Sequence, residues 1–108
     1  MVKRNYNYQK GRRLEYDVMD LLREKGYYTV RSYASKGTFD IIAIRPQYKP
    51  NMDHYPLMIQ CKTNGYIPPK EREELKLASE RYQGFVIIAY RQNGVKFKSL
   101  NGEVISHL

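Results

Sequence analysis

Two apolar stretches decide the fold: FDIIAI at residues 39–44 and LMIQCK at residues 57–62. Both are rich in residues typical of buried strands. Asp40 interrupts the first stretch near its start, and Gln60 and Lys62 interrupt the second at its end. A carboxylate in a buried strand lowers the stability of the fold unless another group compensates its charge. These polar residues therefore indicate a site where the two strands meet.

Patterns on either side of these strands predict two helices and further strands. Leu14, Val18, Leu21 and Leu22 form one apolar stripe, which predicts a helix over 11–25 that stops at Gly26. A second helix is expected over 70–83, ended by Gly84. Strands are expected at 27–33, 39–45, 57–62, 85–90, 95–99 and 103–106, with hairpin turns at Asn93-Gly94 and Asn101-Gly102.

The order αβββαβββ predicts an α/β fold, with one mixed sheet flanked by a helix on each side. The segment 46–56 contains three prolines and is expected to be a long polar connection between two strands. The length of 108 residues predicts one domain over 1–108.

The composition narrows the class of protein. The net charge of +8 favours a nucleic-acid partner, although a basic soluble surface would give the same count. The single cysteine, Cys61, excludes an intrachain disulfide. No apolar run is long enough to span a membrane and no hydrophobic signal region follows the N-terminus, so we expect no membrane partner and a cytoplasmic location.

Basic residues are concentrated at the start of the chain. Residues 1–13 contain no acid, and their cations are Lys3, Arg4, Lys10, Arg12 and Arg13. We expect residues 1–10 to form a basic arm that binds DNA phosphates. A frayed terminus is the alternative.

Asp40, Gln60 and Lys62 can converge if the two strands pair antiparallel. Gln60 and Lys62 then point to the same face, and Asp40 lies close to Gln60. Carboxylate and amide oxygens suit Mg²⁺, with Mn²⁺ as a second ion to consider, and the Cys61 backbone carbonyl can add a third ligand. Lys62 can orient the attacking water. Alternatively, Asp40 pairs with Lys36 or Lys62, and Gln60 is an exposed polar residue.

An ordered set of motifs adds a resemblance over residues 9–100. The segments KGRRLE at 10–15, VRS at 30–32, SKG at 35–37, DIIA at 40–43 and QCK at 60–62 follow one another with the spacing of a known family. The sequence resembles the archaeal-type Holliday junction resolvases of the PD-(D/E)XK nuclease superfamily. The resemblance implies a restriction-endonuclease-like fold and a metal-dependent endonuclease that resolves four-way DNA junctions.

The resemblance also implies roles for individual residues. Glu15 and Asp40 match metal-site carboxylates of the family, Lys62 matches its catalytic lysine, and Ser35 matches a loop serine needed for cleavage. Gln60 belongs to the catalytic set, and Lys36 joins the basic residues of the N-terminus as an expected DNA contact. The family works as a homodimer, which suits paired nicking of two opposed strands. Without the resemblance, Glu15 would read as a solvated helix charge.

Gln60 departs from the superfamily pattern, which usually has an acid at this position. The amide keeps an oxygen ligand but removes one negative charge, so we expect Gln60→Glu to strengthen Mg²⁺ binding. The same residue supports a restriction- or repair-type nuclease that cuts linear or modified duplex. A basic DNA-binding module without catalysis is the third possibility, although binding alone requires no buried carboxylates.

Overall fold

The computed structural model describes residues 6–32, 38–45, 55–106 and 108.

The first helix supplies one layer of the molecule. Helix α1 spans Tyr6–Glu24, so the predicted start at residue 11 is wrong and the backbone of residues 6–10 is part of the helix. Lys3 and Arg4 lie outside the described residues. At the other end, the Gly26 N–H donates to the Arg23 carbonyl at 2.9 Å, which confirms the predicted stop.

The earlier start of α1 has a physical reason. Gly11 weakens a helix by about 1 kcal/mol relative to alanine, and this local preference opposes a helix that continues through it. The apolar stripe of Leu14, Val18 and Leu22 is completely buried against the sheet, and this packing stabilises the whole helix. Tertiary contacts thus outweigh the local preference of one glycine.

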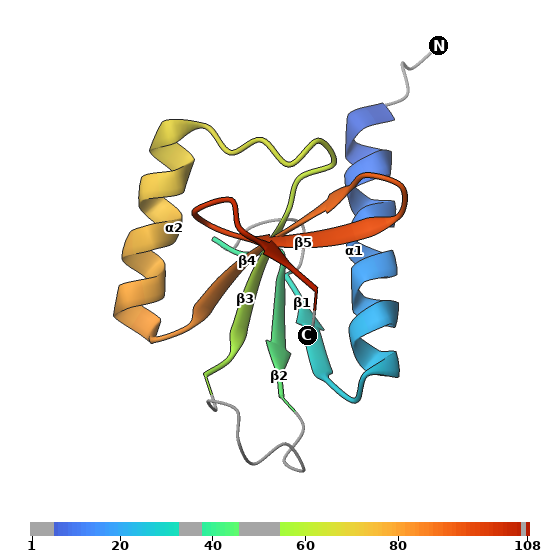
Figure 1. Cartoon of the computed structure of the whole chain (residues 1–108), viewed down its shortest axis with the longest axis horizontal. Helices are drawn as coiled ribbons and strands as arrows, with labels where there is room; N and C mark the ends of the chain where they lie inside the picture. Colours follow the sequence, from blue (N-terminus) through green and yellow to red (C-terminus); the bar gives the residue numbers. More distant parts are fainter. Residues whose placement is uncertain (1–5, 33–37, 46–54, 107) are drawn as a thin grey trace.

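The sheet has six strands in the order β1-β2-β3-β4-β5-β6 (Figure 1). Among the described residues, β3 and β4 form the parallel pair and the other neighbours are antiparallel. The mixed sheet and the order αβββαβββ are therefore confirmed. The strands are Tyr28–Arg31, Ile41–Ile44, Leu57–Cys61, Phe85–Arg91, Val95–Ser99 and Val104–Ile105.

The expected hairpin turns are also present. Asn93 and Gly94 have φ values of 57° and 103°, which gives the paired left-handed backbone of a tight hairpin turn between β4 and β5. In the turn between β5 and β6, Gly102 alone takes the left-handed backbone, with φ 95°. Most of the expected connection over 46–56 lies outside the described residues.

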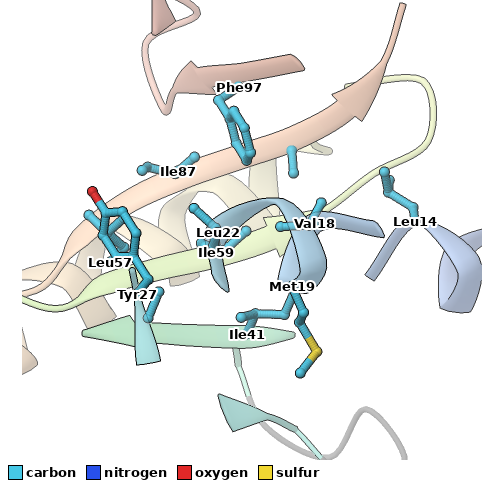
Figure 2. Packing of buried hydrophobic residues seen from close by; sticks show 12 residues of the cluster. Leu14, Val18, Met19, Leu22, Tyr27, Ile41, Leu57, Ile59, Ile87 and Phe97 are labelled. Atoms are coloured by element: carbon cyan, nitrogen blue, oxygen red, sulfur yellow. The ribbon is translucent and has the colours of Figure 1, made fainter. Parts of the chain in front are cut away.

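A hydrophobic core lies on each face of the sheet. On the α1 face, helix side chains meet odd-numbered residues of β2 and β3 (Figure 2). This core contains Leu14, Val18, Leu22, Ile41, Ala43, Leu57, Ile59, Ile87 and Phe97. On the opposite face, Leu75 of α2 packs with Phe39, Met58, Val86 and Ile88. The alternation predicted for 57–62 therefore places Met58 on one face and Leu57 and Ile59 on the other.

Helix α2, Pro69–Tyr82, connects the parallel strands β3 and β4. Its left-handed C-terminal residue is Gln83, with φ 54°, so the interpretation of Gly84 as the residue that ends the helix is wrong. Gly84 instead lies against Met58: a Cβ atom built on it would be 1.7 Å from the Met58 sulfur. Neither helix within the described part of the chain is long and apolar enough to cross a membrane.

Gly84→Ala is expected to destabilise the protein by about 1–3 kcal/mol, because the new methyl group would displace the buried Met58. Urea unfolding measures the change. Gly11→Ala is the matched control: a Cβ there meets nothing within 4 Å, and we expect up to about 1 kcal/mol of stabilisation. Unchanged stability of the Gly84 variant would contradict the steric argument.

Candidate active site

The pairing of β2 with β3 brings Asp40 next to the end of β3. Ile41 is opposite Ile59, and the Asp40 N–H donates to the Ile59 carbonyl at 3.0 Å. The Asp40 Oδ2 atom accepts a hydrogen bond from the Cys61 N–H at 2.8 Å. Asp40 is therefore adjacent to the Gln60-Cys61 segment, as the antiparallel hairpin predicts. The N–H and carbonyl of one strand residue point to the same neighbour, so the Cys61 carbonyl also faces β2.

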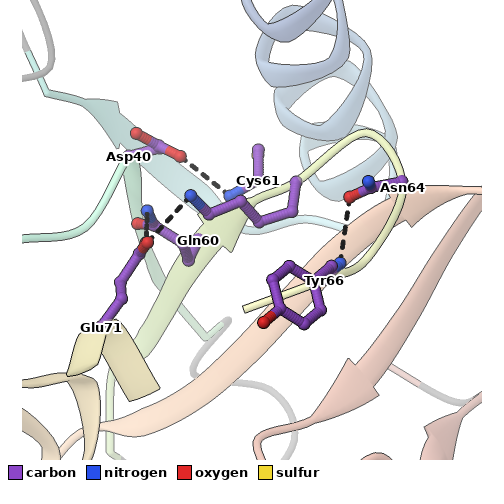
Figure 3. A network of polar contacts seen from close by, with 7 residues as sticks. Asp40, Gln60, Cys61, Asn64, Tyr66 and Glu71 are labelled. Atoms are coloured by element: carbon purple, nitrogen blue, oxygen red, sulfur yellow. Dashed lines mark hydrogen bonds and ion pairs between the residues drawn. The ribbon is translucent and has the colours of Figure 1, made fainter. Parts of the chain in front are cut away.

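Gln60 and Lys62 meet a carboxylate that sequence reasoning did not place in the site. The Gln60 Nε2 atom donates to Glu71 Oε2 at 2.8 Å, and Lys62 Nζ lies 3.0 Å from Glu71 Oε1 (Figure 3). Glu71 belongs to the first turn of α2. In the sequence it appears only as a helix-start acid, because its distance from β3 depends on how the helix crosses the sheet.

The oxygen of the Gln60 amide, unlike its nitrogen, has no partner among the described residues. Gln60 Oε1 is buried, and no hydrogen-bond donor reaches it from the part of the chain that the structure describes. An unpaired buried acceptor costs about 1–3 kcal/mol, so a group that satisfies this oxygen would be stabilised there. A divalent cation is such a group.

The connection after β3 holds α2 in place. The Lys62 N–H donates to the Ala89 carbonyl of β4, and the Gly65 N–H returns to the Lys62 carbonyl at 2.8 Å. Ile67 is buried in the core on the α2 face, and Pro68 and Pro69 start the helix. This short, anchored segment carries Glu71 back over the end of β3.

Glu15 lies on α1 and its charge interacts with that of Asp40. It is buried, with 8% of its surface exposed. Its Oε1 atom accepts from Arg31 Nε at 2.7 Å. Burial raises the pKa of Glu15, the Arg31 hydrogen bond opposes this, and the negative charge of Asp40 raises it further. The structure therefore does not support the solvated-charge interpretation of Glu15. Arg31 is a second residue that sequence reasoning missed, because it lies 16 positions from its partner.

Asp40 is in a similar electrostatic environment. Burial raises the pKa of its carboxyl, whereas the Cys61 N–H and the Lys62 charge lower it. Burial also raises the pKa of the Cys61 thiol, and the charges of Asp40 and Glu15 add to that effect. The carboxyl groups of Asp40 and Glu15 interact and both are costly to ionise, so a nearby cation would stabilise their charged forms.

These residues fit a hard cation through oxygen atoms. Within the described ranges, no three side chains of His, Cys, Asp or Glu gather closely enough to hold a metal by themselves. The candidate ligands are instead the Asp40 and Glu15 carboxylates, the Gln60 amide oxygen and the Cys61 carbonyl. That mixed oxygen set is compatible with Mg²⁺, which usually takes one or two carboxylates and keeps several waters.

The expected DNA-contacting residues are only partly visible. Arg12 and Arg13 are exposed on α1, and the Arg12 guanidinium lies 5.9 Å from the centre of the Tyr16 ring. Lys10 is part of the helical backbone, but its side chain is not among those described. Ser35 and Lys36 lie outside the described residues.

Comparisons with known proteins identify the family. The model of the archaeal Holliday junction resolvase (Hjc) family matches residues 6–107. Among solved structures, the chain is similar to Archaeoglobus fulgidus Hjc, a Holliday junction resolvase from an archaeal hyperthermophile, with a TM-score of 0.65. The two share 21% sequence identity, covering 85% of this chain and 74% of that chain, and this likeness shows the fold alone. No curated protein matches the sequence.

The family match spans nearly the whole chain, and the fold agrees with it. The order of elements, the mixed sheet and the resemblance stated from the motifs all point in the same direction. This chain belongs to the archaeal Holliday junction resolvase family, whose members are generally metal-dependent endonucleases with a restriction-endonuclease-like fold.

Proposed function

We propose that this chain cuts four-way DNA junctions by paired, symmetric nicks as a homodimer that depends on Mg²⁺. One observation carries the proposal: Asp40, Gln60 and Lys62 lie together where β2 and β3 meet, and the buried Gln60 Oε1 has no hydrogen-bond partner within the described structure. A DNA-binding module has no need for this arrangement.

The proposed metal ligands are Asp40, Glu15, the Gln60 side-chain oxygen and the Cys61 carbonyl. When bound, the ion lowers the pKa of a water and stabilises charge on the phosphate. The Cys61 N–H holds the Asp40 carboxylate at 2.8 Å and thereby fixes its direction. Lys62, held by Glu71, orients the attacking water and balances negative charge near the phosphate.

DNA contacts are proposed for the basic residues around the start of the chain. Arg12 and Arg13 are exposed on the helix that also carries Glu15, so phosphates bound there lie near the site. Ser35 is proposed to act in cleavage from its loop. The remaining proposed phosphate contacts are Lys3, Arg4, Lys10 and Lys36.

A homodimer is proposed because the substrate has two-fold symmetry. Resolving a four-way junction requires two cuts on opposed strands, and each chain supplies one candidate site. Two sites related by a two-fold axis would give the symmetric pair of nicks.

The test is cleavage of a labelled four-way junction with Mg²⁺, with Mn²⁺ and with EDTA, beside a linear duplex of the same sequence. We expect cutting of the junction with either metal, loss of cutting in EDTA, and little cutting of the duplex. Equal cutting of the duplex would favour a restriction- or repair-type nuclease. Binding without metal-dependent nicking would favour a non-catalytic module, and a monomer in light scattering would contradict paired nicking.

A further inference from the structure

Glu71 uses each oxygen of its carboxylate for one residue of the candidate site. Oε2 accepts from Gln60 Nε2 at 2.8 Å, and Oε1 lies 3.0 Å from Lys62 Nζ. About a quarter of the Glu71 side chain is exposed, at 26%, so the contact is partly shielded from water. Figure 3 shows Glu71 reaching from the start of α2 toward Gln60, with Asp40 beyond it.

This contact determines which atom of the Gln60 amide is available. An ionised carboxylate only accepts hydrogen bonds, so the NH₂ group of Gln60 must face Glu71. The amide oxygen then points away from Glu71, and it is the atom that is buried without a donor within the described residues. Without Glu71, the amide could turn and present its NH₂ group, which cannot bind a cation.

We propose that Glu71 is a positioning residue that orients Gln60 so that the amide oxygen, and not the nitrogen, faces the divalent metal. This inference rests on the proposed function, because it assumes the metal site described above. Through Glu71, helix α2 would contribute to the metal site as well as packing on the sheet.

Glu71 also affects the Mg²⁺ affinity expected after a substitution at position 60. A glutamate has two equivalent oxygens and needs no orienting partner. The single substitution Gln60→Glu would, however, place a second carboxylate against Glu71 at the distance of the present hydrogen bond. Repulsion between the like charges opposes the gain in Mg²⁺ affinity that the sequence alone suggests.

The test is titration calorimetry of the metal-free protein with Mn²⁺ alone. We expect Glu71→Gln to weaken binding about 10-fold, the usual scale for a residue that orients a metal ligand. Glu73→Gln is the matched control, since it removes the same charge from an exposed position of the same helix. That variant should change the affinity by no more than about twofold, because water and salt screen an exposed charge.

The decisive comparison repeats Glu71→Gln in the Gln60→Glu background. There the side chain at position 60 needs no orientation, and the new amide at 71 can donate to it. Glu71→Gln should therefore cost no affinity in that background, and the two substitutions should be clearly non-additive. An equal loss in both backgrounds, or equal losses for the Glu71 and Glu73 variants, would overturn the proposal.

Folding and the proposed function are checked separately. Circular dichroism and thermal unfolding in EDTA show whether each variant is folded. The double variant carries the same change at position 71, with its hydrogen-bond partner at position 60 exchanged as well. Wild-type protein that fails to bind Mn²⁺ would overturn the metal site and this inference together. Normal Mn²⁺ binding and junction cleavage, with no effect of Glu71→Gln, would overturn only the role of Glu71.

Discussion

Asp40→Asn is expected to lower the rate of junction cleavage at least about 1,000-fold, because the asparagine cannot supply the carboxylate proposed to bind the metal. The loss should be visible in single-turnover cleavage at saturating Mg²⁺. Junction affinity measured in EDTA should be nearly unchanged, since phosphate contacts by basic residues dominate DNA binding.

Asp20→Asn is the control for this change. Asp20 lies on α1 and is exposed, so the same chemical substitution should leave cleavage close to the wild-type rate. Cleavage by the Asp40 variant at that rate would contradict the role assigned to Asp40.

Asp40→Asn, although it should abolish most of the cleavage, is expected to raise the stability of the metal-free protein. The pKa of Asp40 is raised in the folded protein, mainly by burial. The folded state therefore holds its proton more tightly than the unfolded state, and wild-type stability falls as the pH rises from about 4, the usual Asp value, to the folded pKa. Metal-free Asp40→Asn should be more stable than wild type at neutral pH, by about 1 kcal/mol.

Thermal unfolding in EDTA at pH 7 and below pH 4 measures this difference. The gain should shrink at the lower pH, where the wild-type carboxyl is protonated in both states. Added Mg²⁺ should stabilise wild type and leave the variant unaffected. A variant that is less stable than wild type at pH 7 would show that the Cys61 hydrogen bond outweighs the cost of burial.

Lys62→Ala is expected to lower the cleavage rate about 100- to 1,000-fold while retaining Mn²⁺ binding. Lysine is a cation and not a metal ligand, so its loss removes the group that orients water but not the ion. Folding should be retained, because partly exposed ion pairs such as Lys62–Glu71 contribute at most about 1 kcal/mol.

Single-turnover cleavage and Mn²⁺ calorimetry separate this result from that of Asp40→Asn, which should lose both activities. Lys76→Ala, at an exposed position of α2, is the control. Loss of Mn²⁺ binding in the Lys62 variant would show that the lysine supports the metal site itself.

The sequence predicted the parts of the fold that depend on local pattern. Alternation placed Met58 and Leu57 on opposite faces, and the antiparallel pairing of two apolar stretches brought Asp40 to Gln60. The left-handed turn at Asn93 and Gly94 followed from residue type alone. These features depend on neighbours in the chain or on the periodicity of one element.

The parts that sequence reasoning missed depend on packing between elements. The contact of Glu71 with Gln60 requires the position of α2 over β3, and the pair of Glu15 with Arg31 requires α1 to lie against β1. Gly84 was assigned to the end of a helix, but its requirement comes from Met58 on a neighbouring strand. No periodicity contains this information.

The position of Glu71 relative to β3 depends on the number of residues in the connection from Lys62 to Pro68. The ends of this connection are fixed by the hydrogen bond of Lys62 to β4 and by the start of α2, and Ile67 is buried between them. Both ends of the segment are therefore anchored, and one inserted or deleted residue would shift the helix start relative to the strand. Relatives with a different spacer could tune catalysis while every residue that touches the substrate stays the same.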